Sequence, residues 1–321
     1  MKVPQLHVGA GTRLGPLSIF PVWTSDAGDL GISTGTHADV AVTELASGAQ
    51  VARLTVTNNG PLPALLLEGE LLEGGQQHRT CARDVVLGPG ETRDIDTFCV
   101  EAGRWEAGKS SHRRQARRAP LNVWSELANG LDGRRGGDRQ GRIWERVSRF
   151  DAARGASATS SLLDHLDLFK DDGRNRFNAA DAPEQLEGQR GVVIGLGQQP
   201  LLLEVFGTST LFRRHYCQLI DSALLDLELL SPQALASGPM PGQRARDFAA
   251  HVQTMDFGTF DSGAAAVEVR SHGPLRSRNV SRAAGTVSAA GIAVELPARR
   301  PQLAHLTGWN TKHPLMEMAW N

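Results

Sequence analysis

Two short polar stretches contain the side chains best suited to chemistry. The first, residues 68–79, combines carboxylates, glycines, amides and a histidine, and it ends in Arg79. Glu68 and Glu70 lie two residues apart, so on a strand they face the same side of the sheet. Paired carboxylates can hold a metal ion or divide into a general acid and a general base. An exposed, charge-rich turn without chemistry is the alternative interpretation of this stretch.

The second stretch, residues 98–105, ends in Arg104 and Trp105. A planar cation beside a large ring suits stacking on a base or sugar and pairing with phosphate. Cys99 is expected to be a small buried hydrophobic side chain, since a nucleophile needs a group that lowers its pKa and the sequence shows none. Glu101 and Arg104 also suit a structural ion pair.

Together the two stretches resemble a family of uncharacterised domains named for association with ADP-ribosylglycohydrolases and rhodanese-phosphatase superfamily proteins. The resemblance rests on three motifs, which are LEGELLEGGQQHR at 67–79, VLGPG at 86–90 and CVEAGRW at 99–105. It continues in GVVI at 191–194 and LEVFG at 203–207, and it covers residues 10–306. Four positions depart from the family pattern: Glu68, Leu71, Gln76 and His78.

The resemblance implies a role around ADP-ribose, NAD or a related phosphorylated nucleotide, with binding or processing both open and no reaction or cofactor named. Glu70 and Glu101 are then the candidate catalytic carboxylates, which would contact ribose hydroxyls or a divalent ion. The candidate ligand-binding side chains would hold phosphate or stack on a ring: Gln77, Arg79, Arg104 and Trp105. No protein metal site is expected, and the candidate partners are an ADP-ribosylglycohydrolase or a phosphatase.

Two other functions fit the same residues. In the first, the chain is a non-catalytic interaction or scaffold module, and the motif residues form a polar network that stabilises the fold. In the second, it is a metal-dependent hydrolase, because GPGE at 88–91 is similar to a cupin turn. The ten histidines are dispersed, however, with no H-x-H or H-E-x-x-H pair. A serine hydrolase is not indicated, since no G-x-S-x-G motif occurs.

A basic run follows the second stretch. Residues 113–118 contain four arginines, shortly after Lys109 and His112. A solvated loop or linker is the simpler interpretation, but clustered arginines also bind anions and phosphates through paired hydrogen bonds. The net charge of the whole chain is only -1, which argues against a nucleic-acid-binding protein.

Composition limits the protein class. The 321 residues are 40% hydrophobic and 21% charged, which is typical of one large or two ordinary globular domains. The three cysteines form no CxxC pair and no disulfide framework, which favours a reduced, cytoplasmic setting. No apolar run approaches the length of a membrane span, so no membrane association is expected.

The spacing of apolar residues and the positions of turn residues predict the elements that position these side chains. Short strands separated by turns such as Asn58-Asn59-Gly60-Pro61 fill the first hundred residues and suggest a sandwich or barrel. A hairpin over 191–206 precedes a helix over 210–229, and this order excludes a Rossmann interpretation of Gly195-Leu196-Gly197. Residues 130–137 are expected to be flexible, and residues 231–247 to be a connection rich in proline and glycine.

We therefore predict a mixed α+β protein with an N-terminal antiparallel β-sandwich-like region, a helical middle and a C-terminal hairpin-helix-strand region. The predicted regions are 1–105, which carries the motifs, 106–190, which is helical and loop-rich, and 191–321. The last region is expected to share one core with the first, because the family pattern runs across both.

Overall fold

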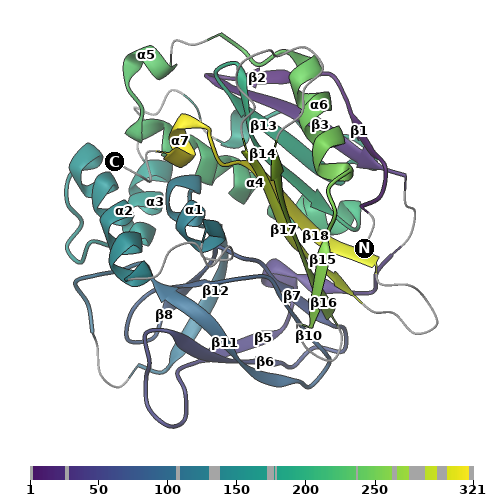
Figure 1. Cartoon of the computed structure of the whole chain (residues 1–321). Coiled ribbons are helices and arrows are strands. Elements are labelled where there is room, and N and C mark those ends of the chain that lie inside the picture. Colours follow the sequence, from purple (N-terminus) through teal and green to yellow (C-terminus); the bar gives the residue numbers. More distant parts are fainter. Residues whose placement is uncertain are drawn as a thin grey trace. The chain divides into compact units, whose positions relative to one another are not determined.

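The computed structural model describes residues 3–25, 29–105, 109–129, 138–171, 177, 179–235, 238–261, 266–274, 286–294 and 302–317. It has helices and mainly antiparallel sheets, which confirms the predicted α+β class (Figure 1). The chain forms two compact units. The first contains Met1–Leu30, Ala180–Tyr216 and Leu230–Asn321, and the second contains Gly31–Ala179 and Cys217–Leu229. The division into three consecutive regions stays a prediction.

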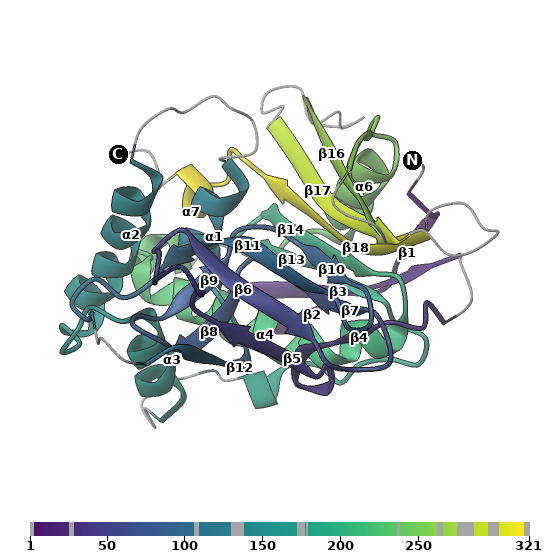
Figure 2. The same cartoon turned by 90° about the horizontal axis from the view of Figure 1, so that it is seen from below.

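A closed antiparallel barrel forms the centre of the second unit, with strand order β11-β6-β5-β12-β8-β9 (Figure 2). Its strands are β5 (Val40–Thr43), β6 (Arg53–Asn58), β8 (Glu70–Gly74), β9 (Arg79–Cys81), β11 (Thr92–Cys99) and β12 (Ser111–Arg118). On β6, Leu54 and Val56 are buried while the side chains between them are more exposed, as expected of a strand with one face on a core.

A smaller sheet covers part of this core, in the order β10-β7-β4. Its strands are β10 (Val85–Leu87), β7 (Ala64–Leu66) and β4 (Ser33–Thr34), and η1 (Gly35–His37) follows β4. Apolar side chains from both sheets pack into one cluster: Val42, Leu54, Val56, Leu66, Leu72, Cys81, Val85, Leu87 and Ile95. These residues form an apolar core of the second unit.

The strand β12 corrects one interpretation of the sequence. The basic run does not form a solvated loop, because residues 111–118 pair with β5 on one side and β8 on the other. The run has no alternation of apolar residues, so nothing in its composition indicates a strand. Backbone pairing with two neighbours holds it in the sheet, and ion pairs with β8 carboxylates, such as Arg114 with Glu70, offset its charge.

The helices of the second unit follow the barrel in the chain. They are α1 (Leu121–Asn129), α2 (Arg139–Arg154), α3 (Leu162–Asp171), η4 (Leu227–Leu229) and the second part of α4 (Ser209–Asp226). The spacing of Ile143, Trp144, Val147 and Phe150 predicts one apolar face of a helix, and on α2 all of these except the partly exposed Trp144 are buried. Asp226 accepts hydrogen bonds from the first two amides of α1, at 2.5 Å and 3.0 Å, and so satisfies its N-terminus. Residues 130–137 lie outside the described residues.

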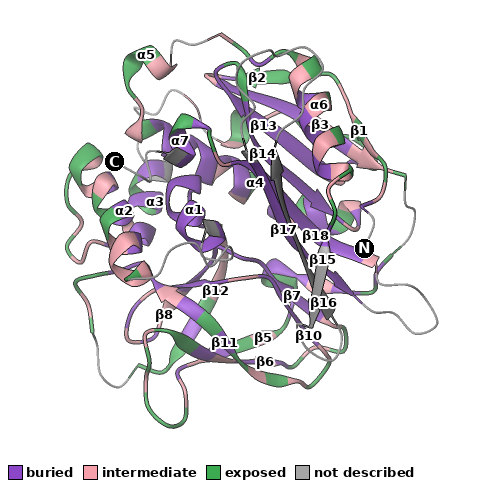
Figure 3. Cartoon of the chain, viewed as in Figure 1, coloured by how far each residue is buried: buried purple, intermediate pink, exposed green. Residues whose placement is uncertain are grey.

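A nine-stranded antiparallel sheet dominates the first unit, in the order β1-β3-β13-β14-β18-β17-β16-β15, with β2 also paired to β3. The strands are β1 (Leu6–Val8), β2 (Thr12–Leu14), β3 (Leu17–Thr24), β13 (Gly191–Leu196), β14 (Gln199–Phe206), β15 (Gly258–Asp261), β16 (Ala266–Pro274), β17 (Thr286–Val294) and β18 (Gln302–Asn310). The predicted hairpin is confirmed as β13 and β14, both largely buried (Figure 3). The predicted helix start is confirmed too, because the Thr208 hydroxyl accepts from the Leu211 amide.

One helix of the first unit was not expected. Residues 242–253 form α6 (Gly242–Gln253), and the first half of this helix lies within 231–247, which was predicted to be a connection. Phe248 and Val252 of this helix pack with Val193 and Leu203 of the sheet in one apolar cluster. Burial of this face therefore outweighs the prolines and glycines just before it. The short elements η3 (Ala179–Asp181), α5 (Pro232–Leu235) and α7 (Pro314–Glu317) complete the described helices.

Within the described residues, no helix combines the length and the apolar character that a membrane crossing requires.

Candidate functional site

Strands β8 and β9 form the tight hairpin that carries the first motif. Gly74 and Gly75 have φ values of 111° and 55°, which side chains with a Cβ rarely adopt. A Cβ at Gly74 would lie 2.9 Å from the Ser111 carbonyl oxygen, and one at Gly75 would lie 2.1 Å from the His112 ring. These glycines therefore let the hairpin approach β12 closely and turn residues 76–79 toward residues 99–104.

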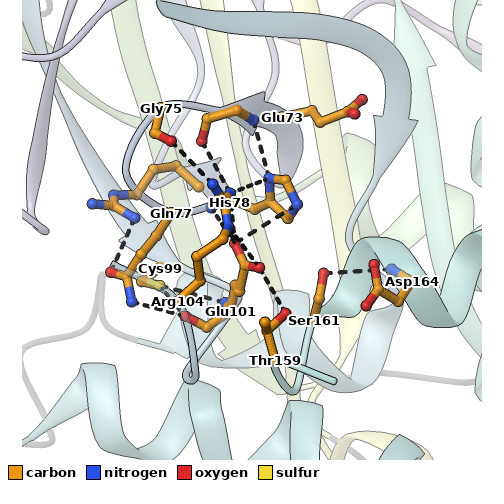
Figure 4. A network of polar contacts seen from close by, with 12 residues as sticks. Glu73, Gly75, Gln77, His78, Cys99, Glu101, Arg104, Thr159, Ser161 and Asp164 are labelled. Atoms are coloured by element: carbon orange, nitrogen blue, oxygen red, sulfur yellow. Dashed lines mark hydrogen bonds and ion pairs between the residues drawn. The ribbon is translucent and has the colours of Figure 1, made fainter. Parts of the chain in front are cut away.

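Glu101 is the centre of the contacts between the two motifs (Figure 4). Its side chain is buried, and both carboxylate oxygens accept hydrogen bonds from Nε of Arg104, at 2.9 Å and 3.0 Å. The His78 amide donates to one oxygen at 2.9 Å, and the Thr159 hydroxyl donates to the other at 2.7 Å. Burial alone would raise the pKa of Glu101, but these donors outweigh burial and hold the pKa below its usual value.

Arg104 uses all three guanidinium nitrogens. Besides Glu101, it donates to the carbonyl oxygens of Gly75 and Gly74, at 3.1 Å and 3.4 Å. Only 15% of its side chain is exposed. A guanidinium with this many protein acceptors has few donors left for a ligand.

Arg79 lies on β9 and is fully buried. Its Nη1 donates to the Gln77 side-chain oxygen at 3.3 Å, and Gln77 in turn donates to the Glu101 carbonyl oxygen at 3.0 Å. Burial lowers the pKa of Arg79. Trp105 lies at the edge of this group, with its ring centre 6.0 Å from the Arg79 guanidinium carbon and 52% of the residue exposed. We call Gln77, His78, Arg79, Glu101, Arg104 and Thr159 the motif network.

Cys99, the last residue of β11, also contacts the motif network. The thiol is buried and donates to the Glu101 carbonyl oxygen at 2.9 Å. Burial raises the pKa of Cys99, although that hydrogen bond and the nearby Arg79 charge oppose the shift. The expectation of a small buried side chain is confirmed.

Glu70 points to a different place from the other predicted site residues. It lies on β8 and accepts a hydrogen bond from Nε of Arg114 on β12, at 2.7 Å, with both side chains 5% exposed. The structure therefore brings Gln77, Arg79, Glu101 and Arg104 together, with Trp105 beside them. It separates Glu70 from that group and pairs it with the basic run.

The arginines of that run line a pocket of about 510 Å³ in the second unit, which we call the β12 pocket. One wall is residues 113–118 of β12. The facing residues come from η1, α3 and α4: Thr36, Leu166, Phe169, Cys217, Gln218 and Asp221. Four arginines thus line the pocket, together with residues that carry apolar, amide, thiol and carboxylate side chains.

The backbone of β12 explains how neighbouring arginines reach one pocket. The register with β8 shifts between Arg114 and Arg118, and Ala116 has a φ of 28°. A bulge of this kind redirects side chains that strict alternation would send to opposite faces. The strand therefore leaves its regular pattern where the arginines gather.

Two of these arginines keep unused donors. Arg114 donates to Glu70 and to the Ala38 carbonyl oxygen, but its Nη2 has no hydrogen-bond partner among the described residues. Arg117 pairs with Asp167 at 2.5 Å through Nη2, and its Nη1 is likewise without a partner in the described chain. A buried guanidinium nitrogen without an acceptor is costly, so a bound anion would stabilise this arrangement.

The arginines of the pocket stand out in the sequence, but the pocket residues on α4 do not. Cys217 and Asp221 lie four residues apart on the helix and so share a face. That spacing was visible in the sequence, but it is common in helices and became informative only beside β12. Within the described residues, no group of three or more histidine, cysteine, aspartate or glutamate side chains is placed to hold a metal ion.

Comparison with known proteins gives one match. The pattern of a family described as "ARG and Rhodanese-Phosphatase-superfamily-associated Protein domain" matches residues 5–309. This range contains both motifs and the β12 pocket. Neither the curated proteins nor the solved structures contain a match to the chain.

Proposed function

The chain belongs to the family of ARG and Rhodanese-Phosphatase-superfamily-associated Protein domains, and on that premise we propose that its second unit binds a phosphorylated ligand of the ADP-ribose and NAD class in the β12 pocket. One observation carries the proposal. Arg114, with a 5% exposed side chain, lines the pocket and has a guanidinium nitrogen that no acceptor of the described chain uses.

The size of the pocket supports a ligand larger than a single phosphate. Its volume of about 510 Å³ falls within the range of roughly 300–1,000 Å³ that is usual for small-molecule and cofactor sites. An inorganic phosphate would fill only a small part of this space. A nucleotide with two phosphates fits the available volume better.

The distribution of side chains supports an order for the parts of such a ligand. The diphosphate would lie against Arg114 and Arg117, whose spare donors suit phosphate oxygens. Leu166 and Phe169 offer an apolar surface for a base. The Asp221 carboxylate is the lining group that suits ribose hydroxyls, since it can accept their hydrogen bonds.

The predicted catalytic roles of Glu70 and Glu101 stay predictions. Glu70 is well placed to orient Arg114, and both oxygens of Glu101 already accept hydrogen bonds within the motif network. The geometry supports positioning roles for both carboxylates, and we propose binding without assigning a reaction.

Calorimetric titration with ADP-ribose, AMP, pyrophosphate and adenosine tests the proposal. We expect ADP-ribose and pyrophosphate to bind and adenosine to bind much more weakly, because the arginines recognise phosphate. Arg117→Gln should weaken ADP-ribose binding about tenfold, the size expected for loss of a charge-assisted hydrogen bond. Arg53→Gln is the matched control, since it removes a surface arginine of the same unit that does not line the pocket. Absence of binding by every phosphorylated compound would overturn the proposal.

A second function is favoured by the motif network itself. A buried, hydrogen-bonded set of this kind suits a scaffold that binds a protein partner, and the exposed Trp105 lies beside it. Under this alternative the partner is an ADP-ribosylglycohydrolase or a phosphatase. Sedimentation of the chain with such an enzyme tests it. Complex formation that Trp105→Ala abolishes would favour the scaffold, and two independent species would count against it.

A further inference from the structure

The three cysteines of the chain differ sharply in their surroundings. Cys81 and Cys99 are buried inside the barrel, and burial raises the pKa of both thiols. Cys217 is exposed and lines the β12 pocket. It is therefore the thiol of this chain that a reagent in solution can reach without opening the fold.

The pocket gives this thiol an unusual neighbourhood. Four arginines, Arg113, Arg114, Arg117 and Arg118, line the pocket with Cys217, and among the lining residues Asp221 is the acidic one. The carboxylates that pair with three of these arginines, Glu73, Glu70 and Asp167, are not lining residues. Four arginines and one carboxylate, Asp221, therefore line the pocket that the thiol of Cys217 borders.

We propose that Cys217 is a site of covalent modification by anionic disulfides, of which oxidised glutathione is the chemical type. Positive side chains around a concave site raise the local concentration of anions and speed their association. The second support is the buried Arg114, which lines the same pocket and has one guanidinium nitrogen without a partner among the described residues.

The reaction is thiol–disulfide exchange. The Cys217 thiol loses its proton to solvent, and the thiolate attacks one sulfur of the anionic disulfide. A bond forms between the Cys217 Sγ and that sulfur, the original S–S bond breaks, and its electron pair leaves with the second sulfur as a thiolate. The disulfide is the oxidant, so no further reactant is needed.

The modification would also control the ligand site. A mixed disulfide with an anionic peptide places a bulky negative group in the pocket and competes with phosphate for the same arginines. This last step rests on the proposed function, whereas the reactivity of Cys217 does not. Reduction of the disulfide would restore the pocket.

Two thiol reagents of different charge test the inference on the intact chain. The rate with the anionic 5,5′-dithiobis(2-nitrobenzoate) and the rate with uncharged 2,2′-dithiodipyridine are each divided by the rate for free glutathione. We expect the normalised anionic rate to exceed the uncharged one about tenfold at low salt, and the excess to fall at high salt. Cys217→Ser should abolish the fast reaction, which identifies the thiol.

Charge variants and a competitor complete the experiment. Arg117→Gln should reduce the anionic excess, and Arg53→Gln should leave it unchanged. Equal normalised rates for the two reagents in the wild-type chain would overturn the proposal. Pyrophosphate or ADP-ribose should slow the reaction of Cys217. If the anionic excess is present but neither compound protects, the thiol site stands and the nucleotide site fails.

Discussion

The motif network and the β12 pocket both hold an arginine against a buried glutamate, yet the two arginines are used differently. Arg104 donates hydrogen bonds from all three guanidinium nitrogens, to Glu101 and to two backbone carbonyl oxygens. Arg114 pairs with Glu70 and keeps one nitrogen without a partner in the described chain. An arginine whose donors are all satisfied stabilises the fold, and an arginine with a spare donor can recognise an anion. Arg79 of the motif network also has two nitrogens, Nε and Nη2, without a partner among the described residues, but it does not line the β12 pocket, so a spare donor marks a binding site only together with a pocket.

The backbone also differs between the motif network and the β12 pocket. Glycines with positive φ close the hairpin of the motif network tightly against β12. The bulge around Ala116 does the opposite, because it opens the regular pattern of β12 and gathers arginines on a pocket. The bulge accompanies a space of about 510 Å³ beside β12.

The largest expected effect is on stability and comes from the motif network. Glu101→Gln leaves the little-exposed Arg104 without its carboxylate, and breaking such a pair should lower the free energy of unfolding by about 3 kcal/mol. Urea denaturation measures the change. Glu73→Gln is the control, because its partner Arg113 is 71% exposed and the loss should stay below about 1 kcal/mol. Equal stability of Glu101→Gln and the wild type would contradict the claim that the motif network stabilises the fold.

Acid should remove the contribution that the ionised Glu101 makes to stability. The pKa of Glu101 is held below its usual value of 4.5, so the native state favours the carboxylate more than the unfolded state does. The contribution is therefore complete above pH 4.5 and decreases as pH falls through the lowered native pKa. Denaturation midpoints from pH 7 to pH 3 should converge for wild type and Glu101→Gln. Midpoints that stay equally far apart in acid would contradict this.

The next effect should appear in binding and in stability together. Arg114→Lys keeps a positive charge near Glu70 but loses the planar fork and its spare nitrogen. We expect about tenfold weaker binding of ADP-ribose and a loss of about 1 kcal/mol in stability. Calorimetric titration and urea denaturation of one preparation give both values. Unchanged affinity would show that the spare nitrogen does not hold the ligand.

The smallest effect is expected at Trp105. Half of this residue is exposed, and a cation–π contact at this exposure contributes about 0.5–1 kcal/mol. Trp105→Ala should therefore lower stability by no more than this and leave the affinity for ADP-ribose unchanged. A large loss of affinity in Trp105→Ala would move the ligand from the β12 pocket to the motif network.

Much of the fold could be predicted, because alternation on β6 and the hairpin of β13 and β14 have strong local signals. The strand β12 and the helix α6 could not, since pairing partners and a buried face outside the local sequence determine them. For the site, the sequence identified the residues of both motifs, and the structure brings Gln77, Glu101 and Arg104 together. Nothing local showed that Glu70 would turn to Arg114, because that contact depends on the register of β8 and β12.

A crystal structure of the chain with ADP-ribose tests the central claim most directly. The account predicts that the diphosphate lies in the β12 pocket, with phosphate oxygens against Nη2 of Arg114 and Nη1 of Arg117, while the motif network keeps its hydrogen bonds. A diphosphate bound to Arg79 and Arg104, with the base stacked on Trp105, would contradict it.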